Sequence, residues 1–211
     1  MPGAFIVVEG PDGAGKTTLA AALARRLREQ GITVREVREP GGTPLAERAR
    51  EAVLDPGLAA SPEAELFLML AARADLVAKV IRPALEAGAW VVSDRFDLST
   101  EAYQIAGRGL PREAALNANW LATKGLAPQL TVVLDVPAAT GQARRAGAGK
   151  AADRIEGDHL SLHQRVARAF REAGGPTVVH LDGTLAAAEV EAAAWAAVRQ
   201  RVGELFPRRQ G

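Results

Sequence analysis

The sequence contains no cysteine, which excludes a disulfide framework, a thiolate metal site and a cysteine nucleophile. It also lacks an excess of charge of either sign. The 26 Lys and Arg residues nearly balance the 25 Asp and Glu residues in a chain of 211, so no basic surface points to a nucleic-acid partner. The apolar runs are too short for a membrane span or a signal peptide. We therefore expect a cytoplasmic protein that binds neither nucleic acid nor membrane.

Histidine is scarce as well, with three residues in the chain. His159 and His163 are four positions apart, which would place them on one helix face, but no third metal ligand accompanies them. We expect both of them, and His180, to be surface residues and not metal ligands.

The segment from Gly10 to Thr17, GPDGAGKT, fits the phosphate-binding pattern G-x-x-x-x-G-K-[ST] at every fixed position. It follows the apolar run 5–8, which predicts a strand, a glycine-rich turn and a helix that opens at Lys16. Such a turn directs several backbone N–H groups at one point, while Lys16 reaches the β- and γ-phosphates and the Thr17 hydroxyl binds Mg²⁺. The alternative is a turn that merely connects strand to helix. The predicted ATP contacts are Gly10, Pro11, Asp12, Gly13, Ala14, Gly15, Lys16, Thr17 and Thr18.

Apolar runs typical of buried strands alternate with helical patterns along the chain. This order predicts an α/β fold: a single P-loop NTPase domain over residues 1–211, with a five-stranded parallel sheet flanked by helices on both faces. The predicted strands are 5–9, 32–37, 90–93, 130–135 and 177–181. The main predicted helices are 16–30, 44–54, 61–87 with a kink near Pro83, and a terminal helix from about 186.

Cations and glycines dominate the segment from Gly141 onward, and no large apolar residue occurs before Ile155. Such a segment packs poorly, which is typical of a mobile lid that closes over phosphates. We expect the lid at about 141–156. The alternative is a solvated basic loop.

Three further motifs follow predicted strands or the lid: Arg38-Glu39-Pro40-Gly41-Gly42-Thr43, then the segment 94–104 with sequence DRFDLSTEAYQ, then Asp153-Arg154-Ile155-Glu156. In an open α/β sheet, segments that leave the carboxyl ends of strands converge on one cleft. In this order and spacing, the motifs and the phosphate loop closely resemble the bacterial thymidylate kinase family over essentially the whole chain. The resemblance implies Mg²⁺-dependent transfer of the ATP γ-phosphoryl group to dTMP, giving dTDP and ADP for dTTP biosynthesis.

Chemistry and the resemblance together suggest roles for the polar residues near the phosphates. Asp94 ends a strand near the phosphate loop, where a carboxylate can hold Mg²⁺. The Arg95 guanidinium matches phosphate geometry, and the family arginine binds the monophosphate of dTMP; the alternative for this pair is a structural salt-bridge network. The family acid that matches Asp12 approaches the 3′-hydroxyl of dTMP. Arg50 is a weaker candidate for a second contact to the acceptor phosphate.

The resemblance also implies a base pocket. Arg73 matches the arginine that hydrogen-bonds thymine O4, and Thr100 and Gln104 match polar positions near the ring. Tyr103 matches a tyrosine that disfavours a ribonucleotide; its alternative is a core aromatic. Met69 stands where many family members carry a phenylalanine that stacks on thymine. Methionine keeps the apolar contact with the base but lacks the flat aromatic face.

One subclass of the family carries an arginine in the phosphate loop. In the other subclass, the lid supplies the positive charges that stabilise the transition state. This sequence carries Gly13 in place of the loop arginine and resembles the second subclass. Arg144 and Arg154 match the favoured lid cations, with Arg145 and Lys150 also available. With Lys16, Asp12 and Arg95, these two arginines form the predicted catalytic set.

Two alternatives to a dTMP kinase remain at this stage. Met69 leaves open a kinase for another nucleoside monophosphate. A nucleotide-regulated binding module with little catalysis is the second, although the guanine-reading pattern N-K-x-D does not occur in the chain. The family also implies a two-fold homodimer, to which the long helix 61–87 would contribute. Whether Glu39–Pro40 is cis or trans stays open.

Overall fold

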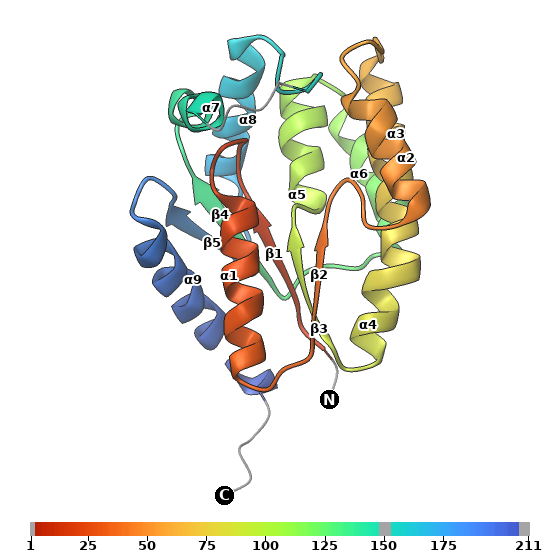
Figure 1. The fold of residues 1–211 in the computed structure, drawn as a ribbon. Helices are drawn as coiled ribbons and strands as arrows, with labels where there is room; N and C mark the ends of the chain where they lie inside the picture. Colours follow the sequence, from red (N-terminus) through yellow and green to blue (C-terminus); the bar gives the residue numbers. More distant parts are fainter. Residues whose placement is uncertain (1–2, 148–152, 207–211) are drawn as a thin grey trace, which may run out of the picture.

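The computed structural model describes residues 3–147 and 153–206, which form a layered α/β fold. Five parallel strands make one sheet in the order β2-β3-β1-β4-β5 (Figure 1). The strands are β1 (Phe5–Glu9), β2 (Val34–Arg38), β3 (Trp90–Asp94), β4 (Leu130–Asp135) and β5 (Val178–Asp182). The predicted five-stranded parallel sheet is confirmed. The predicted β2 begins two residues too early, because Ile32 N still bonds back to Leu27 O at the end of the preceding helix. The predicted β5 begins one residue too early, since Val178 N bonds back to Gly175 O in the turn before it.

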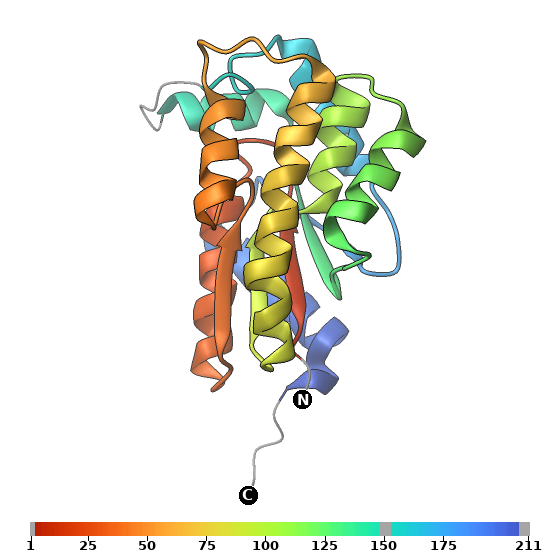
Figure 2. The ribbon, with the colours of Figure 1, turned by 90° about the vertical axis from the view of Figure 1, so that its right-hand side faces the viewer.

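Helices cover both faces of the sheet. Ile6 and Val8 of β1 pack on the side of α1 (Lys16–Glu29) and α9 (Ala187–Val202), whereas Phe5 and Val7 face the other side. This alternation follows from the two-residue period of a strand and buries both faces of β1. Figure 2 shows the second face. The remaining helices are α2 (Pro44–Leu54), α3 (Pro62–Leu76), α4 (Arg82–Glu86), α5 (Asp97–Thr100), α6 (Arg112–Thr123), α7 (Ala138–Gly147) and α8 (Leu160–Glu172).

The helix predicted over 61–87 consists of three consecutive segments. α3 is followed by one π-helical stretch, η1 (Val77–Ile81), and then by α4. Ser61 caps the start, since its hydroxyl accepts a hydrogen bond from Ala64 N at 3.2 Å. Pro83 has no N–H to donate to the preceding turn, and the wider π-helical stretch lies directly before Arg82 and Pro83. The predicted irregularity therefore occurs, but one turn earlier than Pro83 itself.

A second π-helical stretch, η2 (Glu101–Gly107), continues α5 and crosses beside α3 and α8. It places Tyr103 and Gln104 above the carboxyl edge of the sheet. The Glu39–Pro40 peptide bond after β2 is cis. No helix in the described part of the chain is long and apolar enough to cross a membrane.

Candidate active site

A cavity of about 620 Å³ opens at the carboxyl edge of the sheet, between the phosphate loop and the helices on the α3 side. Its walls come from segments that follow β1, β2 and β3, as expected for an open α/β sheet. The eight residues predicted to contact the acceptor all line it: Asp12, Arg50, Met69, Arg73, Arg95, Thr100, Tyr103 and Gln104. Of the remaining predicted site residues, Gly13, Gly15, Lys16, Thr17, Thr18, Asp94 and Arg144 line it as well, whereas Gly10, Pro11, Ala14 and Arg154 do not.

The phosphate loop is shaped by glycines with positive φ. Gly15 has φ 95° and directly precedes α1, so the loop enters the helix through a left-handed residue. At Gly13, with φ 77°, an added Cβ would lie 2.1 Å from the carbonyl oxygen of Gly141. The first turn of α7 therefore packs directly against the loop at Gly13, where a side chain would not fit.

Lys16 is the buried cation of the loop. Its Nζ donates to Pro11 O at 2.8 Å, which folds the side chain back over the loop. Burial, together with the positive charge of Arg95, lowers the pKa of Lys16 to about 8, although Asp12 and Asp94 counteract the shift. A phosphate group in the loop would restore the charged form.

Asp12, Arg95 and Tyr103 form a compact polar cluster at the mouth of the loop. Arg95 Nη2 pairs with Asp12 Oδ1, and the Tyr103 hydroxyl donates to Asp12 Oδ2 at 2.7 Å. Burial acts to raise the pKa of Asp12, but the positive charges of Arg95 and Lys16 outweigh it and hold that pKa well below its usual range. Arg95 has φ 76°, a left-handed backbone that is rare for a residue with a side chain. Such strain is typical of a functional position.

Two oxygen ligands lie together beside the loop. Thr17 Oγ1 donates a 2.5 Å hydrogen bond to Asp94 Oδ2. A hydroxyl and a carboxylate are hard oxygen ligands that suit Mg²⁺, which commonly completes its shell with phosphate oxygens and water. Among the described residues, no group of three or more His, Cys, Asp or Glu side chains could hold a metal ion. A metal here would therefore depend on ligands from the nucleotide.

Arg73 lies at the floor of the cavity with 3% of its surface exposed. It donates to Glu39 Oε2 at 2.7 Å, and its other acceptors are Thr100 Oγ1, Asn119 Oδ1 and Phe96 O. These bonds use four of its five N–H groups, which leaves one on Nη2. Burial raises the pKa of Glu39 to about 7, although Arg73 opposes the shift.

The predicted lid begins as helix α7. Arg144 Nη1 donates to Gly183 O at 2.8 Å, and Arg145 faces Glu156 at 3.3 Å. Residues 148–152, which include Lys150, lie outside the described residues. Arg154 follows them and donates to Glu65 Oε2 at 2.7 Å and to Val53 O at 2.8 Å. It is therefore directed toward α2 and α3 rather than along the cavity wall.

Three buried acids that sequence reasoning missed hold these groups in place. Glu9 accepts from Phe96 N at 2.8 Å and from the Ser99 hydroxyl at 2.7 Å, which fixes the start of α5. Glu39 orients Arg73, and Glu65 lies behind the cavity wall with 1% of its surface exposed. The available signal was an acid within or beside an apolar run, as at Glu9 and Glu65.

The expectation of three surface histidines is wrong for His163. It is 6% exposed and lies on the inner face of α8 with Leu162 and Val166. His159 precedes that helix at its N-cap and is exposed. The two therefore do not share a helix face, since the helix begins only at Leu160. His180 is half-buried, and its Nδ1 lies 3.0 Å from Asp135 Oδ2.

Comparisons with known proteins agree with this geometry. A family model described as thymidylate kinase matches residues 8–194. The curated thymidylate kinase of Deinococcus radiodurans is 47% identical over 202 residues, which cover 94% of this chain and 98% of that protein. The thymidylate kinase of Thermomicrobium roseum is 47% identical over 201 residues, 93% of this chain and 94% of that protein. The thymidylate kinase of Chromobacterium violaceum is 42% identical over 193 residues, which cover 90% of this chain and 91% of that protein.

Proposed function

The chain belongs to the thymidylate kinase family, and we propose from this premise that it transfers the γ-phosphoryl group of ATP to dTMP in a single phosphate-loop domain. The products are dTDP and ADP, a step of dTTP biosynthesis, and the enzyme acts in the cytoplasm. The observation that carries this proposal is the shared cavity, because every residue predicted to contact the acceptor lines the same space as Lys16 and Thr17. A kinase needs its donor and acceptor phosphates in one enclosed site.

ATP occupies the side of the cavity nearest α1. The backbone N–H groups of the loop and the Lys16 ammonium bind its β- and γ-phosphates. Thr17 and Asp94 would hold Mg²⁺, since their oxygens lie together at the start of α1 and the end of β3. An ion bound there would supply positive charge that offsets the charge of the phosphates. The acceptor phosphate oxygen is already anionic, so no protein nucleophile is required.

The dTMP phosphate and sugar lie on the opposite side of the loop. Arg95 binds the acceptor phosphate, with Arg50 as a second contact from α2. Asp12 accepts a hydrogen bond from the 3′-hydroxyl, for which its carboxylate is held ionised by Arg95. The Tyr103 ring lies against the sugar at C2′ and leaves no room for a ribose hydroxyl.

The thymine ring enters the pocket formed by α3 and η2. The remaining Nη2–H of Arg73 donates to O4, because the other four N–H groups are already bound to the protein. Thr100 and Gln104 supply further polar contacts, and Met69 covers one face of the ring. A wrong base would leave these buried groups unpaired, which is the strongest source of polar discrimination.

The lid supplies positive charge to the transferring phosphoryl group. Arg144 lines the cavity from α7, and Arg154 lies beside it with Glu65 and Val53 as partners. In this role Arg154 exchanges its bond to Glu65 for the phosphoryl oxygens as the phosphoryl group is transferred. A positive charge placed beside the negative charge that develops in the transition state lowers the activation barrier more than a positive charge that only binds the substrate.

The active molecule is a homodimer formed through α3 and α6. These neighbouring helices expose large apolar side chains, with Phe67 at 62%, Trp120 at 65% and Leu121 at 72%. A two-fold axis would bury such a patch against its own copy. Sedimentation of the native chain and of Phe67→Glu tests this, because the charged variant should be monomeric while its circular dichroism stays unchanged.

The decisive experiment measures ADP formation from Mg·ATP with dTMP, dUMP, dGMP, UMP, CMP or AMP beside a blank without acceptor. We expect dTMP to exceed every other acceptor by about tenfold or more in kcat/KM. Preference for another monophosphate would retain the kinase chemistry and overturn the assigned base pocket. Rates no higher than the blank would instead favour a nucleotide-regulated binding module.

A further inference from the structure

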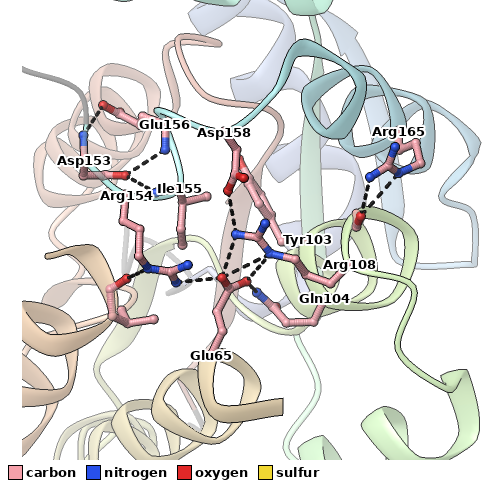
Figure 3. A network of polar contacts seen from close by, with 12 residues as sticks. Glu65, Tyr103, Gln104, Arg108, Asp153, Arg154, Ile155, Glu156, Asp158 and Arg165 are labelled. Atoms are coloured by element: carbon pink, nitrogen blue, oxygen red, sulfur yellow. Dashed lines mark hydrogen bonds and ion pairs between the residues drawn. The ribbon is translucent and has the colours of Figure 1, made fainter. Parts of the chain in front are cut away.

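Glu65 is the centre of a hydrogen-bond network behind the base pocket (Figure 3). Its Oε1 accepts from Gln104 Nε2 at 2.9 Å, and its Oε2 accepts from Arg154 Nη2 at 2.7 Å and Arg108 Nη2 at 2.7 Å. Arg108 Nε lies 3.1 Å from both oxygens, and Arg108 Nη2 also donates to Asp158 at 2.6 Å. Burial acts to raise the pKa of Glu65, but these donors outweigh it and lower that pKa. The side chain is a carboxylate.

An ionised carboxylate can only accept hydrogen bonds, and this restricts the orientation of the Gln104 amide. The NH₂ group must face Glu65, so the carbonyl oxygen Oε1 must face away from it. Within the described part of the chain no residue donates to that oxygen, and it is not among the buried polar atoms that lack a partner. Gln104 lines the cavity. Its Oε1 is therefore the atom of Gln104 that is free to accept a hydrogen bond from a ligand there.

We propose that Glu65 is a positioning residue for base specificity, which acts by fixing Gln104 as a hydrogen-bond acceptor in the pocket. Thr100 accepts from Arg73 and precedes Gln104 by four positions, and all three residues line the same cavity. The cavity is therefore lined by one donor, the remaining N–H of Arg73, and one acceptor, Gln104 Oε1. A pyrimidine with O4 and N3–H matches this pattern, whereas one with an N4 amino group and an unprotonated N3 presents the reverse. This inference rests on the proposed function.

The substitution Glu65→Gln should reverse the Gln104 half of the pattern, whereas the Arg73 N–H remains a donor. The new amide keeps its oxygen at the former Oε2 position, because Arg108 and Arg154 both donate there at 2.7 Å, whereas Arg108 Nε lies 3.1 Å from the Oε1 position. Its NH₂ group then takes the former Oε1 position and faces Gln104. Two NH₂ groups cannot pair with each other, so the Gln104 amide turns over and presents NH₂ to the cavity.

The experiment compares dTMP with 5-methyl-dCMP, a molecule of nearly the same size and shape with the opposite donor and acceptor at positions 3 and 4. We expect the kcat/KM ratio of dTMP to 5-methyl-dCMP to fall about tenfold or more in Glu65→Gln. A merely structural defect would lower both values and leave the ratio unchanged, and that result would overturn the inference. Asp158→Asn is the matched control, because it weakens the same network without touching the carboxylate that faces Gln104. Its ratio should equal that of the native enzyme.

A second variant keeps the inference testable if Glu65→Gln does not fold. Gln104→Leu removes the acceptor, and calorimetric binding should show the same loss of preference for dTMP over 5-methyl-dCMP. An unchanged preference would overturn the inference. The two levels of failure are distinct. A native enzyme inactive on dTMP contradicts the proposed function, whereas native preference for dTMP that survives Glu65→Gln contradicts only the role of Glu65.

Discussion

The Tyr103 hydroxyl donates a 2.7 Å hydrogen bond to Asp12 Oδ2, which joins η2 to the phosphate loop across 91 positions of sequence. Arg95 completes the contact, since its Nη2 donates to Tyr103 Oη at 3.1 Å and pairs with Asp12. The phosphate loop and the proposed dTMP pocket are thereby joined by one cluster of polar contacts. Tyr103 thus has a polar role in addition to the steric one expected from sequence.

Replacing Tyr103 by phenylalanine separates these two roles. Loss of a hydrogen bond to a charged group costs about 1.5–3 kcal/mol, so kcat/KM for dTMP should fall roughly 10- to 100-fold. The ring remains, so the preference for dTMP over its ribonucleotide should persist. Steady-state kinetics with both acceptors test this. Loss of the sugar preference in Tyr103→Phe would show that the hydroxyl, and not the ring, reads C2′.

Much of this architecture follows from local sequence. The apolar runs around Val7 and Val133 predict buried parallel strands, and the glycine spacing predicts the phosphate loop at their carboxyl edge. A continuous apolar run is compatible with few structures other than a buried strand. The predicted bounds of β1 and β4 therefore agree with the structure to within two residues.

Long-range polar contacts could not be predicted in this way. Glu63 and Glu65 are two positions apart in α3, yet the first is exposed and the second is buried. The difference arises because Arg108, 43 positions away, approaches only Glu65. The predicted surface position of His163 is wrong for a related reason. Its burial depends on which face of α8 meets the sheet, and that face is defined only once α8 packs beside η2 and β4.

The pH dependence of ATP binding reports on Lys16. Because burial and Arg95 lower its pKa to about 8, the free enzyme loses the ammonium charge as pH rises through that value. Bound phosphate requires the charged form, so the Kd of a non-hydrolysable ATP analogue should rise about fivefold between pH 8 and pH 9 and change little below pH 7. The groups facing Lys16 are Asp12, Asp94, Glu9 and Arg95.

Lys16→Arg provides the control for this measurement, since a guanidinium stays charged throughout the range. Calorimetric titration of both proteins from pH 7 to pH 9.5 should give a sloping profile for the native chain and a flat one for the variant. The same slope in both would assign the titration to another group.

Arg154→Ala tests whether this arginine acts in the transition state. Its partners Glu65 and Val53 keep it off the cavity wall before substrates bind, so the ground-state complex gains little from it. We expect kcat to fall by about tenfold or more and the Kd of dTMP to change by less than about threefold. Arg168→Ala is a matched control, because Arg168 is exposed and pairs only with Glu172 among the described residues. Equal losses in kcat and binding would instead assign Arg154 to substrate binding.

In the proposed pocket, Met69 covers the flat face of the base. It lines the cavity, is half-buried and packs in the cluster that contains Tyr103 and Ile155. Met69→Phe restores an aromatic face, and stacking adds about 0.5–1.5 kcal/mol, so the Kd of dTMP should tighten roughly three- to tenfold. Met69→Leu conserves volume without a flat face and should leave the Kd nearly unchanged. If calorimetry found unchanged or weaker dTMP binding in Met69→Phe, residue 69 would not be the position that covers the base.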